Sequence, residues 1–205
     1  HLEELRWHII KAIGAVVLFA FIAFLITGFI FDVIIFGPKQ MSFPTYKWLC
    51  KVSQFINIDT TFCGSEFPFV IQNRTMAGQF SAHIWTSIAA GFILAFPYVI
   101  YQIWSFISPG LHSSERRYSK GFIFSASLLF FLGVLFGYYI VIPLSINFLA
   151  NYNISAEISN EVDLTSYIAL VRSSSLASGL VFELPILIYF LTKVGLVTPK
   201  ILKKY

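Results

Sequence analysis

Two charged side chains, Glu183 and Arg172, lie inside a long apolar stretch of this 205-residue sequence. A carboxylate at the centre of a bilayer costs about 2.5–3.5 kcal/mol on insertion scales, so Glu183 is expected to face protein, water or a partner. Two interpretations stay open. The neutral acid donates to the Val181 carbonyl, which Pro185 leaves without its helical N–H partner, or Glu183 is a polar contact for a peptide or a partner helix.

Arg172 and Glu183 share one face if this stretch is a helix. Over eleven residues, at about 100° each, the helix turns about 20° more than three full turns, so the two side chains lie on the same face. The rise along the helix axis is about 16 Å, which is too long for a direct ion pair. Ser175 falls beside the same stripe, so we predict an intramembrane polar site formed by Glu183, Arg172 and Ser175, on a wet groove or a helix-binding surface. Arg172 is only about two turns into the helix, where a long side chain snorkels toward the interface.

A second pair of acids, Glu4 and Glu115, lies in short segments rich in basic residues, HLEELR (residues 1–6) and SSERR (residues 113–117). Acids at these positions suit a helix N-terminus, and Glu115 also has a local partner in Arg116. The alternative is that both carboxylates converge on a ligand that carries a guanidinium group, for which a carboxylate is a bidentate acceptor. The residues alone leave both interpretations open.

Patterns typical of enzymes are missing from the sequence. It contains no HExxH, CxxC, Walker or GxSxG motif, and its four histidines have no metal-ligand spacing. The serines at 173–175 have no histidine in a span at a matching depth. We therefore predict no catalysis, no cofactor and no metal. The net charge of +4 is not organised as a basic stripe outside the apolar segments, which argues against nucleic acid.

The elements that carry these residues are predicted from composition. Hydrophobic residues make up 57% of the chain and charged residues 12%, where soluble domains have about 45–50% and 25%. Because a bilayer core needs about 20 apolar residues per helix, we predict an all-α, polytopic membrane protein with a single membrane domain over residues 1–205. The four predicted spans cover about residues 9–35, 80–107, 121–150 and 164–194, with kinks at Pro97, Pro143 and Pro185. Gly133 and Gly137 form a GxxxG spacing that permits close approach of two helices.

The distribution of Lys and Arg predicts the orientation. Nine of them fall in the N-terminal segment, the loop between the second and third spans and the C-terminal segment, and four fall in the first long loop. The positive-inside rule then places the N-terminus in the cytoplasm and the loops at 37–78 and 151–163 in the periplasm. The first of these loops is long enough to contain short helices. An oxidising periplasm favours a disulfide between Cys50 and Cys63, and two unpaired thiols are the alternative.

Three segments of the sequence resemble the TatC family, the signal-peptide receptors of the twin-arginine protein translocase. HLEELR is similar to the family's N-terminal HLxELR motif. YQIWSFISPGLHSSERR (residues 101–117) is similar to its second span and first cytoplasmic loop, and SYIALVRSSSLASGLVFELP (residues 166–185) to its fourth span. The resemblance implies a glove-shaped helical protein in the bacterial inner membrane. It would bind twin-arginine signal peptides, assemble with TatA- and TatB-type single-span subunits and use the proton-motive force. Membrane lipid and further copies of the chain are additional expected partners.

The resemblance also assigns roles to residues. Its signal-peptide site corresponds here to Glu4, Arg6, Phe106, Glu115, Arg116 and Arg117. Glu183 takes the place of the acidic or polar residue in the fourth span, with Pro185 after it, and Pro38 that of the proline that enters the first outer loop. The family has six spans, so its last two are not expected in these residues. Arg172 departs from the apolar residues expected there. The alternative function is a proton-coupled transporter that uses Glu183, with Arg172 modulating it.

Overall fold

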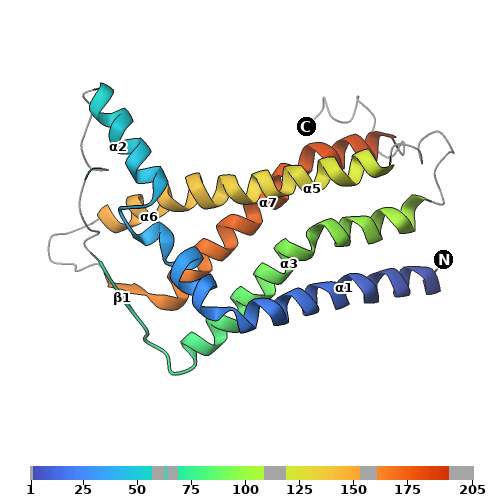
Figure 1. The fold of residues 1–205 in the computed structure, drawn as a ribbon, viewed down its shortest axis with the longest axis horizontal. Helices are drawn as coiled ribbons and strands as arrows, with labels where there is room; N and C mark the ends of the chain where they lie inside the picture. Colours follow the sequence, from blue (N-terminus) through green and yellow to red (C-terminus); the bar gives the residue numbers. More distant parts are fainter. Residues whose placement is uncertain (1, 57–62, 64–68, 109–118, 153–160, 194–205) are drawn as a thin grey trace.

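The structure is a computed structural model that describes residues 2–56, 63, 69–108, 119–152 and 161–193. Four of its helices are long and apolar enough to cross a membrane: Glu3–Leu25, Gly78–Ile107, Gly121–Asn151 and Leu164–Thr192. The prediction of a polytopic helical membrane protein with four spans is therefore confirmed. The spans run back and forth along the long axis of the molecule (Figure 1). One end of the bundle holds the start of α1 (Leu2–Leu25) and the end of α3 (Gly78–Ile107), and we call it the N-terminal end.

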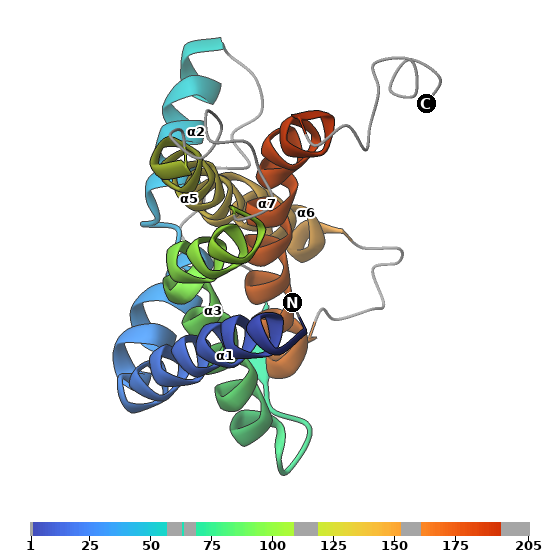
Figure 2. The same cartoon turned by 90° about the vertical axis from the view of Figure 1, so that its right-hand side faces the viewer.

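The opposite end of the bundle is built from short elements, and we call it the α2 end. After α1 the chain forms a π-helical segment, η1 (Phe29–Ile35), a 3₁₀ turn, η2 (Gly37–Lys39), and α2 (Pro44–Ile56). In both ribbon views α2 projects sideways from the spans (Figures 1 and 2). Two three-residue strands, β1 (Val70–Gln72) and β2 (Glu161–Asp163), pair in parallel with Val70 opposite Glu161. The sequence did not predict this strand pair.

The first span differs in its bounds from the predicted residues 9–35. Its α-helix begins at Leu2 and ends at Leu25, and η1 continues it after a turn at Ile26. A change to π-helical hydrogen bonding adds one residue to the turn and depends on the packing around it, so an uninterrupted apolar run gives no sign of it. Apolarity predicted that residues 9–35 are a membrane segment, but not where the helix changes its geometry.

The third span also contains a π-helical segment. It consists of α5 (Ser119–Phe136), η5 (Gly137–Val141) and α6 (Ile142–Asn151). Pro143 is the second residue of α6, where a missing N–H is tolerated, so the irregularity precedes the proline as expected for a kink. Pro97 and Pro185 lie inside the continuous helices α3 and α7 (Leu164–Lys193).

Small residues let the helices approach closely at two crossings. A Cβ atom on Gly91 of α3 would lie 2.5 Å from the backbone nitrogen of Ala20, so α1 packs directly on α3. A Cβ on Gly133 would lie 2.6 Å from the carbonyl oxygen of Ser178, and one on Gly137 2.8 Å from the Ser178 hydroxyl. The GxxxG pair, with Gly133 at the end of α5 and Gly137 at the start of η5, therefore packs against Ser178 and its neighbours on α7, and this part of α7 is an internal helix contact.

Candidate functional site

The N-terminal end brings together the start of α1 and the end of α3, two of the segments predicted to bind a ligand. Glu4 and Arg6 lie exposed on the first turns of α1, and Phe106 lies half-buried in the last turn of α3. Glu115, Arg116 and Arg117 lie outside the described residues. The chain leaves α3 at Ser108, beside the start of α1, and leads into the segment that contains them.

A hydrogen bond that the sequence did not predict fixes α1 against α3 at this end. The Nδ1 atom of His8 lies 2.7 Å from the side-chain oxygen of Gln102, which is buried. The His8 ring is also 6.3 Å from the Phe106 ring, centre to centre. His8 is one turn after Glu4, so this contact sets where Glu4 stands relative to the end of α3. The only sequence signal was a lone amide at Gln102 in an apolar run.

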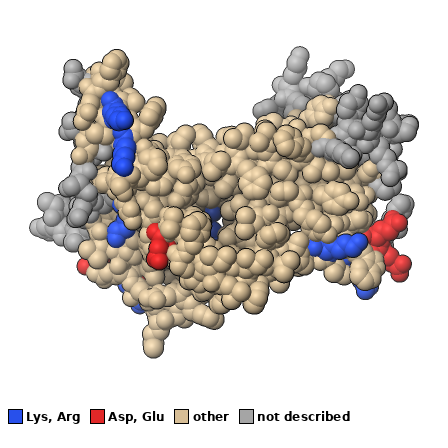
Figure 3. Space-filling model, in the orientation of Figure 1, with Lys and Arg blue, Asp and Glu red and all other residues tan. Residues whose placement is uncertain are grey.

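Charged side chains gather toward the two ends of the molecule, and the face between them is almost free of charge (Figure 3). At the N-terminal end acidic and basic side chains lie close together, as the sequence of α1 requires with Glu3, Glu4 and Arg6 in two turns. A surface with carboxylates and bases at the membrane boundary suits a ligand with charges of its own rather than an apolar one.

The predicted polar site in the fourth span is not one connected cluster. Glu183 is half-buried, and its Oε1 atom is buried without a hydrogen-bond partner in the described part of the chain. No hydrogen bond from Glu183 to the Val181 carbonyl is present there. The hydroxyl of Ser175 is buried and donates to the Val171 carbonyl at 2.9 Å, so its own helix satisfies it. Of these two side chains, Glu183 is thus the one with a buried polar atom that has no hydrogen-bond partner among the described residues.

Arg172 has an aromatic partner rather than an acidic one. Its guanidinium carbon lies 5.9 Å from the centre of the Trp85 ring on α3. Trp85 is 56% exposed, so the pair lies on the outside of the α3–α7 contact. A cation over an aromatic face is a modest stabilising contact, about 0.5–1 kcal/mol at an exposed site. Arg172 is the ninth residue of α7, about 12 Å along the helix from its start, and the snorkelling interpretation stays a prediction.

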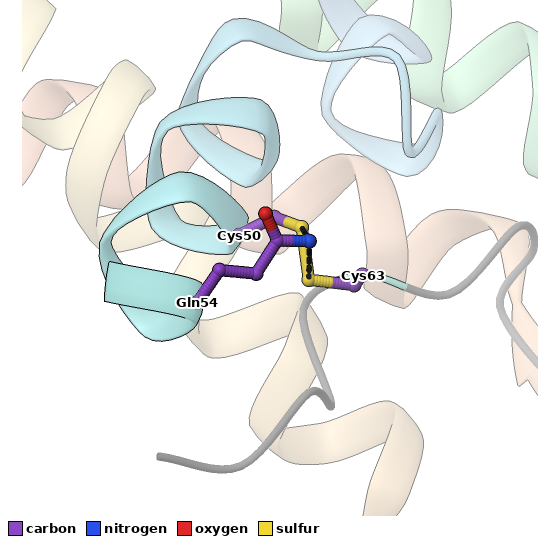
Figure 4. The surroundings of a disulfide bond; sticks show 3 residues. All are labelled: Cys50, Gln54 and Cys63. Carbon is purple, nitrogen blue, oxygen red and sulfur yellow. Dashed lines mark hydrogen bonds between the residues drawn. A yellow bond between two sulfur atoms is a disulfide. The ribbon is translucent and has the colours of Figure 1, made fainter. Parts of the chain in front are cut away.

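Pro38 and the two cysteines belong to the α2 end. Pro38 is fully buried in η2, and its carbonyl accepts a hydrogen bond from the Tyr46 hydroxyl at 3.0 Å. Cys50 of α2 and Cys63 form a disulfide with their Cα atoms 5.1 Å apart. The amide of Gln54 donates to both sulfur atoms (Figure 4). These residues therefore shape the short elements that hold the spans at this end.

No group of three or more His, Cys, Asp or Glu side chains that would hold a metal is present among the residues that the structure covers.

Comparisons with known proteins identify the family. The sequence matches the family described as Sec-independent protein translocase protein (TatC) over residues 1–205. It is 43% identical to the TatC protein of Blattabacterium sp. subsp. Periplaneta americana and 32% identical to that of Aquifex aeolicus. Both alignments cover 100% of this chain, and they cover 77% and 76% of the two relatives.

A solved structure described as the twin arginine translocase receptor TatC has the same fold. It superposes with a TM-score of 0.78 at 30% identity, and the match covers 100% of this chain and 79% of that one. With the sequence match over its whole length, four membrane spans and this fold, the chain belongs to the TatC family, the receptor subunits of the twin-arginine protein translocase.

Proposed function

We propose that this protein binds twin-arginine signal peptides at the N-terminal end of its bundle. The observation that carries the proposal is the His8–Gln102 hydrogen bond, which holds the start of α1 beside the end of α3. Glu4 lies one turn before His8, whose ring is 6.3 Å from that of Phe106, and the chain continues from the end of α3 toward Glu115. Two carboxylates that face one guanidinium pair would distinguish Arg from Lys, because only Arg pairs with a carboxylate in a bidentate manner.

The proposal includes the orientation and the partners that the family implies. The excess of Lys and Arg toward the N-terminal end supports a cytoplasmic N-terminus, and the Cys50–Cys63 disulfide supports an oxidising compartment at the α2 end. We infer that TatA- and TatB-type subunits then join the receptor, and that the proton-motive force drives the transport of folded cargo. Glu183, with its unused buried oxygen, is the residue we expect a partner helix to contact inside the membrane.

Binding of a synthetic signal peptide to the protein in nanodiscs tests the receptor site. The native Arg-Arg peptide is compared with its Lys-Lys version on wild type, Glu115→Ala and Glu4→Ala. Because hydrogen bonds between charged groups contribute about 1.5–3 kcal/mol, we expect the Lys-Lys peptide to bind wild type roughly tenfold more weakly. Both alanine variants should lose most of this preference.

Glu3→Ala is the matched control, since Glu3 is exposed on the same turn of α1 as Glu4. It should keep the preference for Arg-Arg. If all variants keep it, or if wild type binds the two peptides equally, the assignment of this site is wrong.

A proton-coupled transporter is the second candidate, and the unpartnered Oε1 of Glu183 is the observation that favours it. Such a protein would move a solute by itself, and Glu115→Ala would not affect it. Solute flux in vesicles that contain only this protein, lost in Glu183→Gln and kept in Glu115→Ala, would support the transporter and contradict the receptor.

A further inference from the structure

A pocket of about 1360 Å³ lies at the α2 end of the bundle, away from the proposed signal-peptide site. Its walls come from η1, η2, β1 and the first turns of α3 and α7. It is larger than the roughly 300–1,000 Å³ of most small-molecule sites, so its size suits a long ligand better than a metabolite.

The charge of the pocket favours an anion. Among its lining residues Lys39 is the one with a formal charge, and none of them is acidic. The Lys39 ammonium lies 5.8 Å from the centre of the Phe69 ring, and no described acidic side chain pairs with it. The second ionisable group is His83, whose Nε2 lies 3.2 Å from the Phe24 carbonyl and 3.0 Å from the Thr27 hydroxyl. Because Lys39 has no acidic partner among the described residues, a negatively charged group of a ligand in the pocket would balance its charge.

Besides Lys39 and His83, the pocket is lined by apolar side chains, such as Phe31 and Phe80, and by uncharged polar ones, such as Gln40 and Asn73. It lies where the candidate spans begin or end, at the expected membrane boundary. Phe31 is half-buried, and Phe80 is 65% exposed. His83 is five residues after the start of α3, so at 1.5 Å per residue the pocket reaches about 8 Å into that span. The phosphate groups of phospholipids lie at this boundary, with their acyl chains directed into the bilayer, so one ligand would supply both the anion and the apolar part.

We propose that this pocket binds one phospholipid of the leaflet at the α2 end, with its phosphate at Lys39 and its acyl chains against Phe31 and Phe80. The proposal depends neither on signal-peptide binding nor on which side of the membrane the N-terminus occupies. A bound lipid would fill the space between the ends of the first, second and fourth spans, and would thus stabilise the α2 end.

Lipid binding to the delipidated protein in detergent tests this, with native mass spectrometry as the readout. The probes are phosphatidylglycerol, diacylglycerol with the same chains, and inorganic phosphate. Phosphatidylglycerol should bind as a single retained lipid, while diacylglycerol and inorganic phosphate should bind at least fivefold more weakly. One basic residue near lipid phosphate contributes about 1 kcal/mol, so Lys39→Gln should weaken phosphatidylglycerol binding roughly fivefold, and Lys39→Arg should restore it.

Lys47→Gln is the matched control, because Lys47 is exposed on α2 at the same end and does not line the pocket. It should bind phosphatidylglycerol like wild type. If Lys47→Gln weakens phosphatidylglycerol binding as much as Lys39→Gln does, the loss reflects the overall charge of the surface and the proposal is wrong. Equal retention of diacylglycerol would exclude a phosphate site, and equal binding of inorganic phosphate would exclude a lipid. Matching helical circular dichroism of the variants ensures that a loss does not reflect unfolding.

Discussion

The two ends of the bundle are held together in different ways. At the α2 end, three tyrosine hydroxyls donate to backbone carbonyls: Tyr46 to Pro38 and Pro143, Tyr138 to Ile34, and Tyr167 to Ile35. Ile34 and Ile35 end η1, where carbonyls lack partners within the helix. The disulfide, the β1–β2 pair and an ion pair of 2.7 Å between Arg74 and Glu161 add further links.

Among the described residues of the N-terminal end, ring contacts and the hydrogen bond between His8 and Gln102 join the helices. Trp104, Phe122 and Phe190 pack together there, with the Trp104 and Phe122 rings 4.5 Å apart. Ring contacts of this kind tolerate small movements better than hydrogen bonds to backbone carbonyls do.

This difference indicates that the two ends of the bundle have different roles. The α2 end fixes the spacing of the spans, and the N-terminal end keeps charged side chains accessible. In the most apolar 18-residue stretch of each span, 6% of the residues are buried in the first span and 11% in the fourth, against 33% in each of the other two, so the first and fourth helices also leave apolar surface exposed. The proposed recruitment of other subunits would use both the fixed spacing of the spans and this exposed surface.

The largest expected effect is at Tyr46, which is 1% exposed and donates to two elements at once. Tyr46→Ala should lower the free energy of unfolding by about 3–5 kcal/mol, since it leaves a cavity and removes the link between η2 and α6. Thermal unfolding in detergent measures this. Tyr101→Ala, at a 50% exposed position of α3 toward the other end, should cost less than about 1 kcal/mol. Equal losses would contradict the division into a fixed and an open end.

Removal of the disulfide should have the next largest effect. Cys50 and Cys63 are 13 residues apart, and closing a loop of about this size contributes up to roughly 3 kcal/mol by restricting the unfolded chain. The Cys50→Ser, Cys63→Ser double variant should therefore melt below wild type, and reductant should bring wild type to the same value. Signal-peptide binding should change little. If the double variant melts like oxidised wild type, the disulfide does not contribute to the frame.

Loss of a single tyrosine hydroxyl at the α2 end should cost less. Tyr167→Phe removes the 2.9 Å hydrogen bond to the buried carbonyl of Ile35 and keeps the ring, so we expect a loss of about 1–2 kcal/mol. Tyr98→Phe on α3, where the ring is 39% exposed, should leave the melting temperature unchanged. If Tyr98→Phe lowered the melting temperature more than Tyr167→Phe, the hydrogen bonds from tyrosine hydroxyls to backbone carbonyls would not be what stabilises the α2 end.

Most of the fold could be predicted from the sequence, because three of the spans are charge-free runs long enough to cross a bilayer core, and the fourth is apolar apart from Arg172 and Glu183. The same reasoning does not predict η1 or η5, since π-helical turns depend on packing that an apolar run does not encode. Nor does it predict the β1–β2 pair, whose strands have three residues each and lie about 90 residues apart in the chain. Such short strands form only where the spans bring them together.

The candidate site was predicted less completely. The acids of the N-terminal end stand out because they occur among basic residues, but the bond between His8 and Gln102 joins residues 94 apart and has no local signature. In the fourth span, the stripe of Arg172 and Ser175 was predicted from helical geometry alone. Geometry gives the shared face, but it does not show that the Ser175 hydroxyl bonds to its own helix or that Arg172 faces Trp85.

The smallest expected effect is at Asp163, which caps the start of α7. Its Oδ2 atom accepts hydrogen bonds from the Thr165 hydroxyl and from the backbone N–H groups of Thr165 and Ser166, at 3.0 and 3.2 Å. The hydrogen bond from the Thr165 side chain is the main cause that lowers the pKa of Asp163 below its ordinary 3.8, against a smaller opposing effect of desolvation.

A carboxyl group whose pKa is lowered by folding stabilises the folded state above its unfolded pKa, and this contribution disappears as the pH falls through the folded pKa. Asp163→Asn should therefore show slightly faster hydrogen exchange than wild type in the first turn of α7 at pH 7, because a neutral amide is a weaker acceptor at a helix N-terminus. The difference should shrink once the pH is below about 3.8, as wild type becomes protonated. The ratio of the exchange rates of the variant and of wild type at each pH removes the intrinsic pH dependence of exchange and the titration of other acids. If this ratio of exchange rates stayed constant as the pH fell well below 3.8, the charge of Asp163 would not stabilise the start of α7 at the α2 end.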